Sequence, residues 1–223
     1  MNDIAIFDLD LTLISVDTTN KWVSLMIEKG IIEDQKEYLK QKSIYDQQYK
    51  NGTLKIEDAY QLFLKPMIDI DLSILESEFN DFANLLNDYV YPDAKDRLNY
   101  HHKKGDEVLL ISASIEEILR PIGLKLGFKE ENIIGSKTIK NNNRFNGEII
   151  SPSSFSQGKC FYFEEWISRN NKIHNKSIFY SDSINDFPLL NKVDNPICIN
   201  PDPLLKDQAT KNKWKIENWE IKV

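Results

Sequence analysis

Short apolar runs that alternate with helical segments constrain the fold of this chain more than any other feature of its sequence. Runs of four to six residues suit strands buried in a parallel sheet, whereas the segments between them have apolar side chains at helical spacing. The expected strands cover residues 4–7, 107–112, 131–136, 177–182 and 196–200. The expected helices cover residues 94–104, 115–127 and 157–170. This alternation predicts an α/β fold with a parallel sheet flanked by helices, and residues 137–150 read as an additional two-stranded hairpin.

Residues 17–91, between the first two expected strands, read as a separate helical insert. Apolar residues recur there at helical spacing, and Gly30 and the pair Asn51–Gly52 interrupt the pattern. The segment carries 14 acidic and 8 basic residues, a balance of −6, and it contains no arginine. We therefore expect a catalytic core formed by residues 1–16 and 92–223 and a helical cap formed by the insert.

The composition narrows the class of protein. The 223 residues suffice for a sizeable core, and no apolar run is long enough to span a bilayer. The two cysteines, Cys160 and Cys198, have no metal-type spacing, which favours reduced thiols in a cytoplasmic protein. The net charge of −7 argues against nucleic acid as a partner. We expect neither a nucleic-acid nor a membrane partner, and no pattern in the sequence indicates an oligomeric state.

Polar side chains gather at the carboxyl ends of the expected strands. Asp8 and Asp10 follow the first strand, Ser112 ends the second, and Asp182 ends a later one. Further polar groups near the same edge are Thr12, Lys159, Asn185 and Asp186. Because ligands bind outside the carboxyl ends of strands in such sheets, we expect these groups to meet there. Clustered aspartates with a lysine and hydroxyl groups favour Mg²⁺-dependent phosphoryl transfer, in which a carboxylate attacks phosphorus.

Four segments of the chain resemble the motifs of the haloacid dehalogenase superfamily in order and spacing. "FDLDLTL" is similar to Asp-x-Asp-x-Thr, and "LLISAS" is similar to an apolar strand that ends in Ser or Thr. "QGK" resembles the motif that supplies a lysine, and "FYSDSINDFPLL" resembles Asp-x-x-x-Asp. The insert resembles the cap of the phosphoserine-phosphatase-like branch (subfamily IB). The resemblance implies a Rossmann-like three-layer core with a parallel sheet, a C1-type helical cap after the first strand, and a Mg²⁺-dependent phosphatase that acts through an aspartyl-phosphate.

The same resemblance implies a role for each motif residue. Asp8 takes the position of the nucleophile and a metal ligand, and Asp10 that of the general acid, whose backbone carbonyl also binds the metal. Asp182 takes the position of a direct Mg²⁺ ligand. Asp186 takes the position of a residue that either binds the Mg²⁺ directly or contacts one of its ligands. Leu11 stands where many members have glycine. The phosphate-holding positions fall on Ser112, Lys159 and Asn185.

The cap indicates a small phosphomonoester substrate with a positive charge. Asp17 takes the position of a cap glutamate that holds the amino acid in phosphoserine phosphatases. Their cap arginine has no counterpart here, because residues 17–91 contain no arginine. An acidic cap rich in aromatic residues favours a cationic group on the substrate. The candidates are an amino-alcohol phosphate, histidinol phosphate and phosphoserine. The carboxylate of phosphoserine could still bind lysines of the cap.

Two other classes of protein share parts of this pattern. A phospho-receiver signalling domain also places aspartate, a hydroxyl group and lysine around Mg²⁺ on a parallel sheet. Receivers are shorter, carry the acceptor aspartate on a later strand and lack a helical cap. The second alternative is a non-catalytic binding protein of the same fold, against which the intact set of Asp8, Asp10, Lys159 and Asp182 argues.

Several other polar residues have simpler interpretations. We expect Ser114 to cap the helix that begins near Ile115, and Thr12 could hydrogen-bond within its own turn. Tyr45 and Tyr49 are one helical turn apart, and packing is the preferred interpretation over contact with a substrate. The histidines expected at the surface are His101, His102 and His174.

Overall fold

The structure of the protein, a computed structural model, describes residues 2–50, 53–170 and 174–221. The strands are β1 Ile4–Phe7, β2 Glu107–Ile115, β3 Ile133–Ser136, β4 Thr138–Asn141, β5 Arg144–Ile149, β6 Ser177–Ser181, β7 Asn195–Ile199 and β8 Lys215–Glu217. The α-helices are α1 Thr18–Glu28, α2 Gln35–Lys50, α3 Ile56–Leu64, α4 Leu72–Leu85, α5 Pro92–Lys104, α6 Glu116–Lys125, α7 Gln157–Asn170, α8 Phe187–Leu190 and α9 Pro203–Asn212. The 3-10 turns are η1 Lys65–Met67, η2 Leu86–Tyr89, η3 Glu130–Asn132 and η4 Ile184–Asp186.

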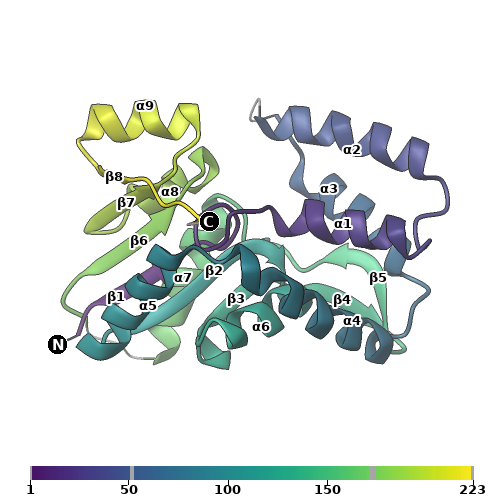
Figure 1. The fold of residues 1–223 in the computed structure, drawn as a ribbon, viewed down its shortest axis with the longest axis horizontal. Coiled ribbons are helices and arrows are strands. Elements are labelled where there is room, and N and C mark those ends of the chain that lie inside the picture. Colours follow the sequence, from purple (N-terminus) through teal and green to yellow (C-terminus); the bar gives the residue numbers. More distant parts are fainter. Residues whose placement is uncertain (1, 51–52, 171–173, 222–223) are drawn as a thin grey trace.

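A parallel six-stranded sheet forms the centre of the molecule, in the order β3-β2-β1-β6-β7-β8. The side chains of β1 alternate between two apolar layers. Ala5 and Phe7 pack with residues of α5 and α6, and Ile4 and Ile6 pack with residues of α7, α8 and α9. Figure 1 shows α5 and α6 on the near side of this sheet. Because both faces are covered, β1 is apolar along its whole length, and the α/β fold class is confirmed.

The element boundaries follow the sequence pattern closely. The first strand and the helix at residues 157–170 have the expected bounds, and residues 138–149 form the expected antiparallel hairpin. Helix α5 ends where expected, because Gly105 adopts a left-handed conformation with φ 80°. β2 continues three residues beyond the expected end, as far as Ile115.

The insert between β1 and β2 is helical, as expected, and carries α1 to α4 (Figure 1). It is not isolated from the rest of the chain, since α4 packs on α6 and α3 packs on β5 of the hairpin. The backbone N–H of Leu72 also donates to the carbonyl of Asn143 at 2.9 Å. The division into a core and a cap at residues 17 and 91 stays a prediction, and Asn51 and Gly52 lie outside the described residues.

The expectation that His101 lies at the surface is wrong. Its side chain is 1% exposed, because this face of α5 packs on the sheet. The ring nitrogen Nδ1 lies 2.8 Å from a carboxylate oxygen of Asp106, and Nε2 lies 2.9 Å from the hydroxyl oxygen of Tyr180. These two polar partners satisfy a histidine that would otherwise be costly to bury.

The described part of the chain contains no helix that is long and apolar enough to cross a membrane.

Candidate active site

Three neighbouring strands bring the candidate site together at their carboxyl ends. Phe7 of β1 is paired with Leu110 of β2 and with Tyr180 of β6. The residues that follow these positions therefore meet at one edge of the sheet. Eight of the polar residues singled out in the sequence line one cavity of about 980 Å³, namely Asp8, Asp10, Asp17, Ser112, Lys159, Asp182, Asn185 and Asp186. Thr12, which was also expected at this edge, is not among the lining residues.

Lys159 reaches the end of β1 from the first turn of α7. Its ammonium donates to Oδ1 of Asp8 at 2.6 Å and to Oδ2 of Asp186 at 2.7 Å. The preceding residue has to be glycine, since a Cβ on Gly158 would lie only 1.7 Å from the carbonyl oxygen of Ser153. The "QGK" motif therefore combines a close backbone approach with a buried cation between two carboxylates.

The loop after β6 is held by hydrogen bonds from other segments. Asp186 accepts a second hydrogen bond from the hydroxyl of Ser181 at 2.6 Å. Thr12 donates to Oδ1 of Asp182 at 3.2 Å, so it bonds the opposite loop and not only its own turn. Asp202 accepts from the backbone N–H of Ile184 at 2.6 Å, and its own N–H donates to the backbone carbonyl of Asp182. Each acidic group of this loop is thereby fixed in place.

Asn185 lies in this loop and lines the cavity near these carboxylates. Its side-chain amide donates to the hydroxyl oxygen of Ser183 at 3.2 Å, which also accepts from the backbone N–H of Asn185 at 3.2 Å. The Ser183 side chain caps η4 through the second of these bonds.

The side chain of Asp10 is held by the N-terminus of α1. The backbone N–H of Thr18 donates to Oδ1 at 2.9 Å, and the Thr18 hydroxyl donates to Oδ2 at 3.1 Å. That hydroxyl also lies 3.1 Å from the hydroxyl of Ser114. The interpretation of Ser114 as a helix cap is wrong, because α6 begins at Glu116 without a side-chain cap. Leu11, beside Asp10, adopts a left-handed conformation with φ 56°, which explains why glycine suits this position.

Burial and like charge dominate the electrostatics of the site. Burial, opposed by the charge of Lys159 and reinforced by that of Asp186, raises the pKa of Asp8 to about 6. Burial, followed by the charges of Asp8 and Asp186, raises the pKa of Asp182 well above its usual range. Burial, followed by the charges of Asp17 and Asp8, also raises the pKa of Asp10 well above its usual range. If all of these carboxyl groups were ionised, they would carry more negative charge than Lys159 offsets.

This excess of buried negative charge fits a divalent cation with oxygen ligands. In the described ranges of the chain, no three His, Cys, Asp or Glu side chains are grouped as metal ligands. Both carboxylate oxygens of Asp10 accept hydrogen bonds from Thr18, whereas Asp8 and Asp182 accept through Oδ1, from Lys159 and Thr12 respectively. Two carboxylates with a backbone carbonyl and water suit Mg²⁺, which keeps several water ligands.

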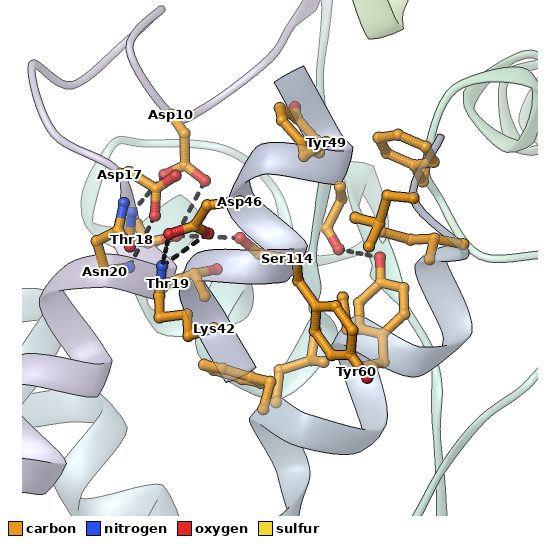
Figure 2. A pocket seen from close by; sticks show the side chains of 18 of the residues that line it. Asp10, Asp17, Thr18, Thr19, Asn20, Lys42, Asp46, Tyr49, Tyr60 and Ser114 are labelled. Atoms are coloured by element: carbon orange, nitrogen blue, oxygen red, sulfur yellow. Dashed lines mark hydrogen bonds and ion pairs between the residues drawn. The ribbon is translucent and has the colours of Figure 1, made fainter. Parts of the chain in front are cut away.

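A second pocket of about 190 Å³ extends from Asp10 between β2 and the helices α1, α2 and α3. Figure 2 shows Asp17, Lys42 and Asp46 grouped on one side of it and Tyr49 and Tyr60 on another. Asp17 is also the N-cap of α1 and accepts from the backbone N–H of Asn20 at 2.7 Å. The preferred interpretation of Tyr45 and Tyr49 as packing residues is incomplete, because both line this pocket.

Three supporting residues were missed in the sequence. Thr18 holds Asp10, Ser181 bonds Asp186, and Asp202 bonds the loop after β6. Only Asp202 has a local signal, since an Asp followed by Pro203 is typical of a helix start. The other two contacts span only eight and five residues of the chain, but no motif in the sequence singles them out.

The chain resembles known proteins along its whole length. Residues 5–191 match the model of the haloacid dehalogenase-like hydrolase family. A histidinol-phosphatase of Neisseria meningitidis serogroup C is 31% identical over 225 residues, which cover 99% of this chain and all of that protein. The crystal structure of a protein of unknown function from Bordetella pertussis Tohama I superposes with a TM-score of 0.90 at 26% identity, over the full length of both chains.

A phosphoserine phosphatase that carries an analogue of its phospho-aspartyl intermediate has the same fold. It superposes with a TM-score of 0.67 at 17% identity and covers 96% of this chain and 92% of its own. Fold, site and relatives together define a phosphatase and not a receiver domain. The chain belongs to the haloacid dehalogenase-like hydrolases, and it shares its fold with a phosphoserine phosphatase.

Proposed function

We propose that this protein is a Mg²⁺-dependent phosphomonoester hydrolase that acts through an aspartyl-phosphate on Asp8. The observation that carries the proposal is the contact of the Lys159 ammonium with Asp8, at the bottom of a cavity that Asp10 and Asp182 also line. This contact holds one oxygen of Asp8 and leaves the carboxylate at the cavity surface. Bound Mg²⁺ would neutralise the phosphate oxygens and align phosphorus with Asp8.

Two carboxylates divide the chemistry between them. A carboxylate oxygen of Asp8 bonds to phosphorus while the bond from phosphorus to the ester oxygen breaks, and Asp10 donates its proton to that leaving oxygen. Asp10 then takes a proton from a water molecule, whose oxygen attacks the same phosphorus and releases inorganic phosphate from Asp8. The raised pKa of Asp10, caused first by burial and then by the charges of Asp17 and Asp8, suits a group that must start protonated.

The remaining polar groups hold the phosphoryl group and the ion. Lys159, Ser112 and Asn185 are proposed to contact phosphate oxygens, where donors stabilise the charge of the transition state. Asp8, Asp182 and the backbone carbonyl of Asp10 are proposed as the Mg²⁺ ligands from the protein. Asp186 bonds Lys159 and Ser181, which favours a role in holding Lys159 over direct contact with the metal.

The proposed substrate is the phosphate ester of a small cationic alcohol, of which histidinol phosphate is the leading candidate. The second pocket adjoins Asp10, where the leaving alcohol must lie, and its walls carry Asp17 and Asp46 together with aromatic rings. Carboxylates and aromatic faces both bind an ammonium or imidazolium group. The name of the relative from Neisseria meningitidis agrees with this choice.

The test compares histidinol phosphate, O-phosphoserine and para-nitrophenyl phosphate as substrates of the purified chain. We expect release of inorganic phosphate from all effective substrates with Mg²⁺ and none with excess EDTA. The kcat/KM should be highest for histidinol phosphate. Turnover that persists in EDTA would contradict the proposed mechanism, and a preference for a substrate without a cationic group would contradict the proposed substrate class.

A further inference from the structure

An ion pair on α2 projects into the pocket of the leaving group (Figure 2). The Lys42 ammonium donates to Oδ1 of Asp46 at 2.8 Å and to Oδ2 at 2.7 Å. The Lys42 side chain is 15% exposed, whereas that of Asp46 is 53% exposed. Both carboxylate oxygens are therefore engaged by a lysine that lies largely inside the pocket.

The order of the two residues argues against a role confined to stabilising the helix. Side chains four residues apart on a helix stabilise it best when the acidic residue precedes the basic one. Here Lys42 precedes Asp46, so the pair contributes less to α2 than the reverse order would. Its place among the lining residues of the pocket indicates a role toward the bound molecule.

We propose that Asp46 masks Lys42, and that this pair makes the enzyme reject substrates with a carboxylate next to the amino group. The inference rests on the proposed function and identifies the residues that set its substrate class. Lys42 is the basic residue among those that line the small pocket, where the acidic ones are Asp10, Asp17 and Asp46. With the Lys42 ammonium paired to Asp46, no other cation among the described lining residues of this pocket is available to a substrate carboxylate.

The charges in the pocket attract a substrate ammonium group and repel a substrate carboxylate. Burial raises the pKa of Asp17, the charge of Lys42 lowers it, and the charge of Asp46 raises it further, so these three side chains lie close together. A substrate ammonium that enters beside them would gain two carboxylate neighbours. A substrate carboxylate would meet the same two groups, and it could pair with Lys42 only by displacing Asp46, which would leave a carboxylate without its partner.

The experiment uses two substrates that differ by a single carboxylate, O-phosphoethanolamine and O-phosphoserine. The kcat/KM of each is measured for the wild-type chain, Asp46→Asn, Lys42→Met and the double variant. Each value is divided by the value of the same variant for para-nitrophenyl phosphate. The matched control is Glu37→Gln, which removes one negative charge from the same helix, where Glu37 pairs with Lys40 at 3.6 Å in an exposed position.

We expect the wild-type chain to prefer O-phosphoethanolamine. Asp46→Asn frees the Lys42 ammonium, and the ratio of the two kcat/KM values should then move toward O-phosphoserine by roughly tenfold or more, the value of a hydrogen bond to a charged group. Adding Lys42→Met should remove this gain, and Glu37→Gln should leave the wild-type ratio in place.

Three results would overturn the inference. These are a wild-type preference for O-phosphoserine, an unchanged ratio in Asp46→Asn, and a gain that survives in the double variant. Failure of the proposed function has a different signature, because the wild-type chain would then hydrolyse para-nitrophenyl phosphate without preferring either histidinol phosphate or O-phosphoethanolamine to it. If the cationic substrates are preferred but Asp46→Asn leaves the ratio of the two kcat/KM values unchanged, only the masking role of Asp46 is refuted.

Discussion

Replacing Lys159 by methionine tests whether the buried lysine holds the folded site together. Its side chain is 3% exposed, and those of its partners Asp8 and Asp186 are 9% and 4% exposed. Methionine fills a similar volume without a charge, so the variant leaves both carboxylates buried without their common cation. Breaking a buried ion pair by removing one partner costs about 3–5 kcal/mol. That is a large fraction of the roughly 5–15 kcal/mol by which a domain is stable.

The loss should depend on pH in a defined direction. Burial raises the pKa of Asp8 to about 6 while Lys159 lowers it, so removing the lysine raises this pKa further. Unfolded aspartates titrate near about pH 3.9, so the folded variant retains a proton that the unfolded chain has released. Stability linked to such a group is present below the unfolded pKa and is lost as pH rises through the folded pKa. The deficit of Lys159→Met should therefore be larger at pH 8 than at pH 5.

The assay is urea unfolding followed by tryptophan fluorescence, in EDTA, at both pH values. We expect the free energy of unfolding to fall by about 3–5 kcal/mol at pH 8 and by less at pH 5. The control is Lys192→Met. The ion pair between Lys192 and Glu164 is exposed and should contribute at most about 1 kcal/mol to the free energy of unfolding. If Lys159→Met does not fold at pH 8, adding Asp8→Asn should restore folding. A deficit below about 1 kcal/mol at pH 8, or equal deficits at both pH values, would refute the reasoning.

The remaining predictions concern catalysis. Asp8→Asn should abolish turnover while circular dichroism shows an intact fold, and Asp10→Asn should lower kcat by ~10²–10⁴-fold, as loss of acid–base catalysis does. Asp182→Ala should weaken Mg²⁺ binding in a metal titration more than Ser112→Ala does, and equal affinities would contradict the proposed ligands. Asp17→Asn keeps a side chain that can cap α1, and should lower kcat/KM for histidinol phosphate relative to para-nitrophenyl phosphate by roughly five- to a hundredfold, the value of one charged contact.

The sheet was predictable because buried parallel strands have a characteristic sequence pattern, a short continuous apolar run. β1 is covered on both faces, so Ile4 to Phe7 form a continuous apolar run. In the helices between the strands, apolar residues instead recur roughly every three to four positions. The carboxyl ends of such strands converge whatever the side chains are. The topology alone therefore brings Asp8, Ser112 and Asp182 to one cavity.

Some supporting contacts could not be predicted, because they depend on how distant segments pack. Thr18 and Ser114 are 96 residues apart and meet only where α1 begins against the end of β2. His101 lies in a polar stretch of α5 that gives no sign of which face is buried, and its partner Tyr180 is 79 residues away. No local pattern encodes such pairs, whereas the N-cap of Asp17 three residues before Asn20 is local.

In the proposed mechanism, the N-terminus of α1 would link substrate recognition to the chemical step. Asp17 caps this helix and faces the pocket, while Thr18 holds the carboxyl group of Asp10 through its N–H and its hydroxyl. The positive end of the helix dipole lies beside both carboxyl groups and favours their charged forms, whereas burial favours protonation. A cation bound beside Asp17 would offset the charge that raises the pKa of Asp10 after burial. A cationic leaving group would therefore make Asp10 a stronger acid at the moment when it must donate a proton.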